Sequence, residues 1–145
     1  MTTAKEIDEI INFIDIRKSL KKIVLYSCTS SYPAKIEDVK LLDILNLKNK
    51  YGKYIKALGF SGHHNGISID NASISLGASW IERHFTFDRS AKGTDHAASL
   101  ELEGLAKLRG RLDETNLALQ YKPKEILKNE IFQRKYLKKI VKLKT

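Results

Sequence analysis

Three short runs rich in β-branched and aromatic residues alternate with segments of helical periodicity, and this alternation restricts the fold most. The runs are IVLYSCTS (23–30), IKALGF (55–60) and SWIERHFTF (79–87). Each is predicted to be a strand. With the helical segments around them, the predicted order is α-β-α-β-α-β-α-α. Strands separated by helices are expected to be parallel and joined by right-handed crossovers, so the fold class is α/β.

The helical segments are predicted from apolar spacing and from their end signals. The first follows a capping box of Thr3 and Glu6. The others are predicted over 37–50, over 67–76, from near Ser99 and from Pro123. The apolar residues expected on buried helix faces are Ile7, Ile10, Ile11 and Ile14, then Val39, Leu42 and Leu45, then Leu105, Leu108, Leu112 and Leu119. Three parallel strands are too few to close a barrel, so we expect a small open sheet or part of a larger one.

The positive charge of the chain is concentrated at its C-terminal end. Residues 121–145 hold nine Lys or Arg and two Asp or Glu, whereas the whole chain has a net charge of +9. Such a tail could bind nucleic acid or an anionic surface, or it could be the solvated face of a helix. The solvated face is the favoured interpretation, and nucleic acid is not an expected partner.

Composition favours a folded protein of the cytoplasm. The chain of 145 residues has the length of about one domain, and it contains no apolar run of about 18 residues that would span a membrane. The start, MTTAKEIDEIINF, lacks the apolar core of a signal peptide. The single cysteine, Cys28, cannot form an internal disulfide, which suits a reducing cytoplasm. Cys28 is expected to be an ordinary strand residue.

All the histidines of the chain lie in the turns that follow the second and third predicted strands. They are His63, His64, His84 and His96. Turns at the carboxyl ends of parallel strands build the sites of α/β folds, so these turns are expected to meet. In the third strand Glu82, His84 and Thr86 share one face by the period of two. A polar face of this kind suits a barrel lumen or a site.

The residues alone leave two interpretations of the histidines open. In the first, His63 and His84 hold a divalent metal, with Asp95 or Glu82 nearby as an oxygen ligand or substrate contact. In the second, His84 is a hydrogen-bonded core histidine and His64 is an exposed turn residue. Two histidines at this distance in sequence match no local metal signature.

Three segments together resemble the sialic acid synthase family. They are CTSSYP with EDVKL, then GFSGHH, then SLGASWIERHFTFDRSAKGTDHAASLE. The family comprises N-acetylneuraminate synthases and their legionaminic and pseudaminic acid relatives, and the resemblance runs over about 1–139. It implies a (β/α)8 barrel of the TIM type. This chain, with three parallel strands and flanking helices, would be a partial barrel.

The resemblance also implies an enzyme. The implied reaction condenses phosphoenolpyruvate with N-acetylmannosamine or a related 2-acetamido sugar to a nonulosonic acid plus phosphate. It requires a divalent metal, typically manganese, with magnesium as the alternative. His63 and His84 match the two metal ligands, so they are the expected catalytic residues. The substrate-binding positions are matched by Ser30 and Ser61 for phosphoenolpyruvate and its phosphate, and by Tyr32 and Asp95 for the sugar.

Two features depart from the family pattern. The family's turn usually reads G-[YLF]-S-D-H-T, whereas here Gly62 replaces the aspartate and His64 the threonine. We expect the change at Gly62 to remove a partner of the metal histidine or a local charge, and we expect His64 to be exposed. The second departure is length, because the family has about half a barrel before Met1, with a phosphate-binding lysine and a catalytic glutamate. Residues 1–121 thus correspond to the second half of the barrel. Residues 122–145 correspond to a basic, linker-like helix with no antifreeze-like domain after it.

Two classes of function follow. In the first, the chain is the metal-site part of a synthase, and its partner is a complementary N-terminal half-barrel or further copies of itself. In the second, it is a non-catalytic remnant or binding module that self-associates through open strand edges and carries a basic tail. The first class is favoured by the resemblance.

Overall fold

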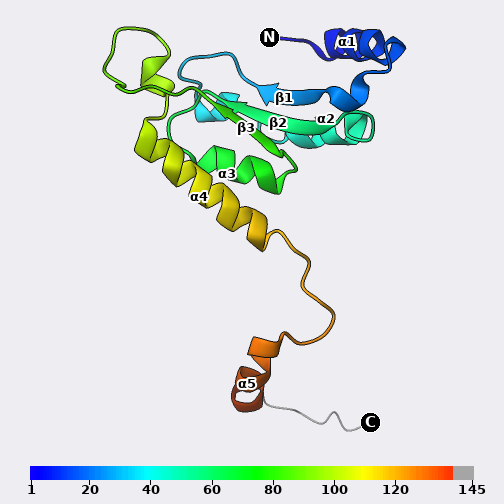
Figure 1. Ribbon diagram of the computed structural model, residues 1–145, viewed down its shortest axis with the longest axis vertical. Coiled ribbons are helices and arrows are strands. Elements are labelled where there is room, and N and C mark those ends of the chain that lie inside the picture. Colours follow the sequence, from blue (N-terminus) through cyan, green and yellow to red (C-terminus); the bar gives the residue numbers. More distant parts are fainter. Residues whose placement is uncertain (139–145) are drawn as a thin grey trace.

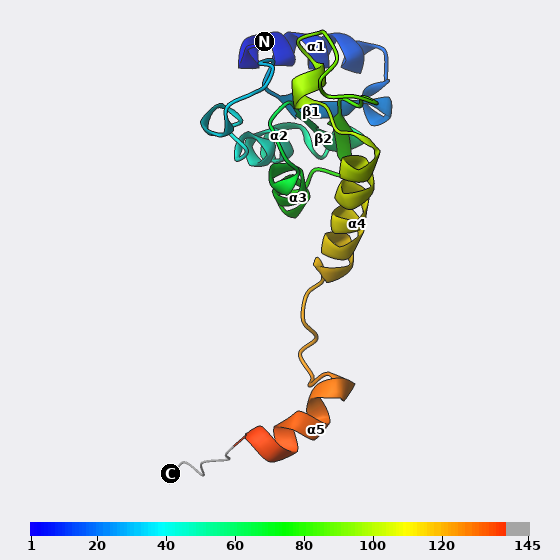
Figure 2. The same ribbon diagram turned by 90° about the vertical axis from the view of Figure 1, so that its left-hand side faces the viewer.

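The structure is a computed structural model that describes residues 1–138, and it confirms the predicted element order (Figure 1; Figure 2). The elements are α1 (Ala4–Ile16), β1 (Val24–Cys28), α2 (Asp43–Tyr51), β2 (Ala57–Gly62), α3 (Ser68–Ser75), β3 (Trp80–Arg83), α4 (Leu102–Ala118) and α5 (Lys128–Leu137). Short 3-10 helices lie at Leu20–Lys22, Ile36–Asp38 and His96–Ala98. Within the described chain, no helix is both long enough and apolar enough to cross a membrane.

The three strands form one parallel sheet in the order β1-β2-β3, as the alternation predicted. Its register places Cys28 beside Ser61, and Ser61 beside Glu82. The carboxyl ends of the strands therefore lie together, and the turns that follow them meet at one end of the sheet. Cys28 is a strand residue, as predicted.

The apolar core lies on one face of the sheet, between the strands and helices α1 to α3. One cluster consists of Ile11, Leu20, Leu47, Tyr51, Ile55 and Leu58. A second cluster consists of Val39, Ile44, Phe60 and Ala78, with Leu41, Ile69, Leu76 and Ile81 packed against it. By the alternation of strand side chains, Tyr26, Ser61 and Glu82 point to the other face. Among residues 1–138 no further apolar cluster covers that face, so the sheet has one packed and one open side.

The helix predicted over 37–50 is the largest error in the predicted elements. It begins only at Asp43, because a 3-10 helix at Ile36–Asp38 and the left-handed backbone of Lys40 (φ 50°) interrupt the predicted run. Of the three residues predicted on one face of this helix, Val39 is buried, whereas Leu42 is 67% exposed and Leu45 37% exposed. Residues such as Ile44 are buried in their place.

The remaining differences lie at element ends. β3 stops at Arg83, four residues before the end of the predicted run at Phe87, and α5 begins at Lys128 rather than at Pro123. Helix α4 begins at Leu102. Of its predicted buried residues, Leu108 is buried and Leu112 half-buried, whereas Leu105 and Leu119 are 40% and 50% exposed.

Helix α1 is held to α2 by one carboxylate. Lys50 Nζ donates to Asp8 Oδ2 at 2.7 Å, and the Tyr51 hydroxyl donates to Asp8 Oδ1 at 2.6 Å. The hydrogen bonds from Lys50 and then from Tyr51 hold the pKa of Asp8 below its ordinary value of 3.8. A carboxyl whose folded-state pKa is lowered stabilises the fold above its ordinary pKa, and this stabilisation is lost as the pH falls through the folded-state pKa.

Replacing Asp8 with asparagine is therefore expected to lower the melting temperature at neutral pH. Below about pH 4, the melting temperature of this variant should fall less steeply than that of the unchanged protein. Circular-dichroism melts of both proteins over a pH series measure this. Asp113→Asn is the matched control, because it breaks an exposed i,i+4 pair with Arg109 that contributes little. Parallel pH profiles for Asp8→Asn and the unchanged protein would contradict the expectation.

Candidate functional site

His63 and His84 meet at the carboxyl end of the sheet. Each follows the last residue of its strand directly, His63 after β2 and His84 after β3. Their ring centroids are 5.0 Å apart and the ring planes are nearly perpendicular. Tyr32, from the loop after β1, has its ring centroid 4.3 Å from that of His63 and 5.5 Å from that of His84. The turns after all three strands thus contribute to one site.

His63 is fixed by hydrogen bonds from both its side chain and its backbone. Its Nδ1 lies 2.8 Å from the carbonyl oxygen of Thr29, and its own carbonyl accepts the backbone N–H of Ala34 at 2.9 Å. A carbonyl oxygen only accepts, so Nδ1 donates, and in the neutral imidazole this leaves the lone pair on Nε2. Metal-binding histidines usually donate their second ring nitrogen in this way. The orientation of His63 therefore fits a metal ligand.

His84 has an acidic neighbour but no close hydrogen bond to it. Its Nδ1 lies 3.7 Å from Asp95 Oδ2, which is longer than a hydrogen bond. In the described part of the chain no three side chains of His, Cys, Asp or Glu are grouped to hold a metal. The two imidazoles fit a divalent metal that takes its other ligands from oxygen atoms outside this set, such as water or substrate.

The serines predicted to bind substrate lie close to this pair along the strands. The hydroxyl of Ser61 donates to Glu82 Oε1 at 3.3 Å, on the same face as the histidines. Ser30 is exposed and follows Thr29, whose carbonyl binds His63. The structure therefore gathers all the predicted site residues at one end of the sheet.

The loop after β3 is held by internal hydrogen bonds. Thr86 Oγ1 lies 2.8 Å from His96 Nδ1, and the hydroxyl and backbone N–H of Ser90 donate to Asp88 Oδ1 and lower the pKa of Asp88. Thr86, which was predicted to share one face with Glu82 and His84, lies beyond the end of β3 and is buried against His96. Thr86 and His96 thus fix the loop that carries Asp95.

His64 is not the exposed turn residue that the sequence predicted. It is fully buried on the helix-covered face, where its Nε2 lies 3.3 Å from Asp70 Oδ2. Its alternation with His63 turns it away from the open face, and the carboxylate of Asp70 on α3 meets it there. Asp70, which is fully buried, was not among the residues predicted from the sequence to belong to the site. Its sequence signal is a lone acidic residue within the apolar and small residues of the helix ISIDNASI.

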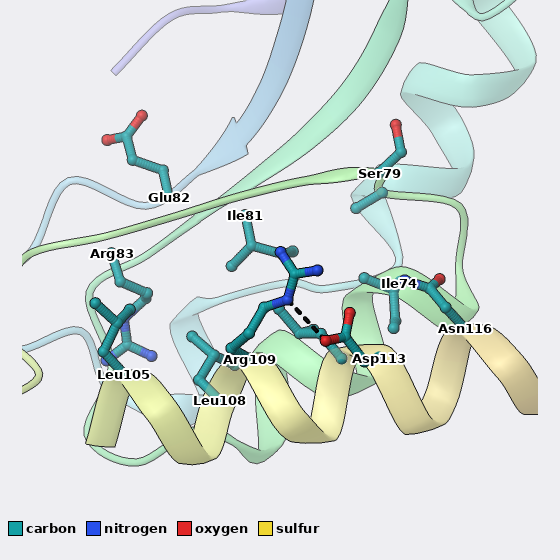
Figure 3. Close-up of a pocket in the computed structure, with 12 residues that line it drawn as sticks. Ile74, Ser79, Ile81, Glu82, Arg83, Leu105, Leu108, Arg109, Asp113 and Asn116 are labelled. Carbon is teal, nitrogen blue, oxygen red and sulfur yellow. Dashed lines mark hydrogen bonds and ion pairs between the residues drawn. The ribbon is translucent and has the colours of Figure 1, made fainter. Parts of the chain in front are cut away.

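A separate cleft of about 580 Å³ lies between β3 and α4 (Figure 3). Its apolar lining includes Ile81 of β3 with Leu105 and Leu108 of α4, and the ion pair of Arg109 with Asp113 is also part of its wall. Glu82 is the one candidate residue from the sequence that lines this cleft, whereas neither His63 nor His84 does. The cleft is therefore separate from the histidine pair.

Comparison with known proteins identifies the relatives of this chain. A profile of the NeuB family matches residues 1–124. The chain is 37% identical to N-acetylneuraminate-9-phosphate synthase of Drosophila melanogaster over 88% of its length and 34% of the relative. It is 34% identical to N,N'-diacetyllegionaminic acid synthase of Campylobacter jejuni over 90% of its length and 38% of the relative.

A solved structure extends the likeness to three dimensions. The N-acetylneuraminic acid (sialic acid) synthetase from Leptospira borgpetersenii superposes with a TM-score of 0.78 at 33% identity. The match covers 94% of this chain and 47% of that protein, so the chain spans between a third and a half of the relatives it matches. The predicted partial barrel is confirmed by this superposition. From its sequence and its fold, the chain belongs to the NeuB family of sialic-type acid synthases.

Proposed function

We propose that the chain supplies the metal-site half of a synthase. This synthase would condense phosphoenolpyruvate with N-acetylmannosamine or a related 2-acetamido sugar, giving a nonulosonic acid and phosphate. The observation that carries the proposal is the pair of imidazoles 5.0 Å apart, with His63 oriented by the Thr29 carbonyl. The relatives, which are named as synthases of sialic-type acids, support the reaction class.

In this proposal His63 and His84 would hold a divalent metal, most typically manganese, with magnesium as the alternative. When bound, the metal supplies Lewis-acid polarisation of the sugar carbonyl. The ring of Tyr32 packs against both imidazoles and would restrain their orientation. The hydroxyls of Ser30 and Ser61 would donate hydrogen bonds to phosphoenolpyruvate and its phosphate.

Asp95 would accept a hydrogen bond from a hydroxyl of the sugar. Its carboxylate lies 3.7 Å from His84 and is largely exposed on the open side of the site, where a substrate has access to it. The loop bonds of Thr86 and His96 hold Asp95 at this place.

We also propose that a complementary half-barrel closes the open side of the sheet. Three features support it: no apolar cluster covers the open face, β1 and β3 are each paired along only one side in residues 1–138, and apolar side chains form part of the lining of the cleft beside β3. Unpaired strand sides favour pairing with another chain or segment. Two copies of this chain would supply six strands, too few for the eight of the barrel, so a different segment is favoured over a second copy.

A chimera tests the proposal. The N-terminal half of the Leptospira protein is fused to this chain, and phosphate release is measured with phosphoenolpyruvate, N-acetylmannosamine and Mn²⁺. We expect Mn²⁺-dependent release in step with nonulosonic acid, lost in the same chimera with His84→Ala. The intact Leptospira protein is the positive control. A folded, monomeric chimera without activity would contradict the proposal and favour the non-catalytic interpretation.

A further inference from the structure

We infer that three residues on the packed face of the sheet, Arg83, Asp70 and His64, position the two site histidines. We call them the Arg83 cluster. The inference rests on the proposed function in one respect, that His63 and His84 hold a metal. Its geometric part, the orientation of His63 and His84, stands on the structure alone.

The Arg83 cluster is a buried set of charged and polar groups. The side chains of Asp70 and His64 are fully buried, and that of Arg83 is 2% exposed. Arg83 Nη1 donates to Asp70 Oδ2 at 2.5 Å, and His64 Nε2 lies 3.3 Å from the same oxygen. One carboxylate oxygen thus joins β3 to the turn after β2.

The guanidinium of Arg83 also binds the backbone of that turn. Its Nη2 donates to the carbonyl of His64 at 2.7 Å, and its Nη1 donates to the carbonyl of Gly66 at 2.8 Å. Arginine can make these contacts together because its nitrogens form a rigid planar fork. Lysine has a single nitrogen and cannot span the same acceptors.

These contacts lie one residue away from the proposed metal ligands. His64 follows His63, and Arg83 precedes His84. The side chains of His64 and Arg83 lie with Asp70 on the packed face, whereas the rings of His63 and His84 meet on the other side. Holding residues 64 and 83 therefore restrains the backbone that carries His63 and His84. From the packed face of the sheet, the Arg83 cluster therefore sets the distance between the two imidazoles.

The cluster also explains the glycine at position 62. A Cβ there would lie 2.8 Å from Asp70 Oδ1 and 3.0 Å from Arg83 Cδ. The carboxylate of Asp70 thus fills the space of a residue-62 side chain. Asp70 on α3 thus gives Arg83 the negative partner that a carboxylate at position 62 of the strand would otherwise provide.

Stability of the fold alone is a poor explanation for this arrangement. Within residues 1–138, His64 Nδ1, Asp70 Oδ1 and Arg83 Nε are buried and have no hydrogen-bond partner. Buried polar atoms without partners destabilise a fold, and buried ion pairs are often no better than apolar packing. A positioning role accounts for a charged cluster at this place.

Nuclear magnetic resonance of the metal-free chain with labelled histidines tests the inference. Two signals are followed: the Nδ1-protonated form of His63 and the nuclear Overhauser contacts between the rings of His63 and His84. We expect both signals to be lost or averaged in Arg83→Lys and in Asp70→Asn. Asp8→Asn, which removes a carboxylate contact between α1 and α2, is the control that leaves them unchanged.

A rescue experiment distinguishes the positioning of His63 and His84 from a general destabilisation of the fold. Asp70→Ala should lose the ring contacts, and Asp70→Ala combined with Gly62→Asp should regain them by returning a carboxylate to Arg83. With Mn²⁺ added, we expect the folded single variants to bind about 10- to 100-fold more weakly, as is typical for partners of metal ligands. Unchanged ring contacts in any folded single variant of Arg83 or Asp70 would overturn the inference. If Arg83→Lys does not fold, the shape-conserving Asp70→Asn and the rescue pair decide.

The outcomes for the two proposals are distinct. A chain that binds no Mn²⁺ but shows the ring contacts and their loss would overturn the proposed metal site and keep the positioning role. A chain that binds Mn²⁺ with equal affinity in all cluster variants would keep the metal site and overturn the positioning role.

Discussion

Replacing His84 with alanine is expected to lower the affinity of the chain for Mn²⁺ by more than about 100-fold, which exceeds the loss typical for residues that only support a metal ligand. Two imidazoles, those of His63 and His84, lie edge to face in the proposed site, with ring centroids 5.0 Å apart. No larger group of ligating side chains joins them in residues 1–138. If one imidazole is lost, the site keeps a single protein nitrogen as a ligand for Mn²⁺. Its other ligands would be oxygen atoms, which water and surface carboxylates supply equally well. His63→Ala should therefore have the same effect.

Electron paramagnetic resonance of free Mn²⁺ during a titration measures the affinity, and native mass spectrometry gives the number of metals per chain. His96→Ala is the matched control, because His96 lies on the same loop as Asp95 but has its Nδ1 bonded to Thr86. We expect His96→Ala to retain binding within a few-fold. Equal losses in His84→Ala and His96→Ala would show that the loop as a whole, and not a ligand pair, governs binding. If His84→Ala binds Mn²⁺ as tightly as the unchanged chain, His84 is not a ligand of the metal.

The sequence allowed the order of elements and the place of the site to be predicted, because both depend on neighbours along the chain. Alternating strand and helix signals predict parallel strands, and parallel strands bring their following turns together. His63, His84 and Tyr32 meet for this reason, although they come from three separate turns. The capping box of Thr3 and Glu6 is likewise a local signal, and it marks the start of α1 correctly.

The errors arise where a distant residue or one backbone angle decides the outcome. His64 sits in a glycine-rich turn, and only the position of Asp70 beneath it shows that its side chain turns inward. The start of α2 was misplaced because apolar spacing continues through Lys40, whose left-handed backbone no spacing reveals. The third strand was predicted too long because β3 pairs with β2 only as far as Arg83, and strand ends follow tertiary contacts more than propensity.

A second large effect is expected in the core, where Phe60→Ala should reduce the free energy of unfolding by about 3–5 kcal/mol. Phe60 is 2% exposed and packs with Ile44 and Ala78 beneath β2. The sheet has one packed face, so its apolar core is small, and small domains lie at the low end of the usual 5–15 kcal/mol. The variant is therefore expected to be largely unfolded at room temperature.

Urea unfolding followed by circular dichroism measures this loss, with Phe87→Ala as the matched control. Phe87 is 93% exposed, so removing its ring should change stability by no more than about 0.5 kcal/mol. A loss below about 1 kcal/mol for Phe60→Ala would mean that this core is not packed as the structure shows. The site depends on the same packing, because the Phe60 ring lies 6.0 Å from that of His64. A folded Phe60→Leu variant with weakened Mn²⁺ binding would then show that packing beneath the strands reaches the histidines on the open face.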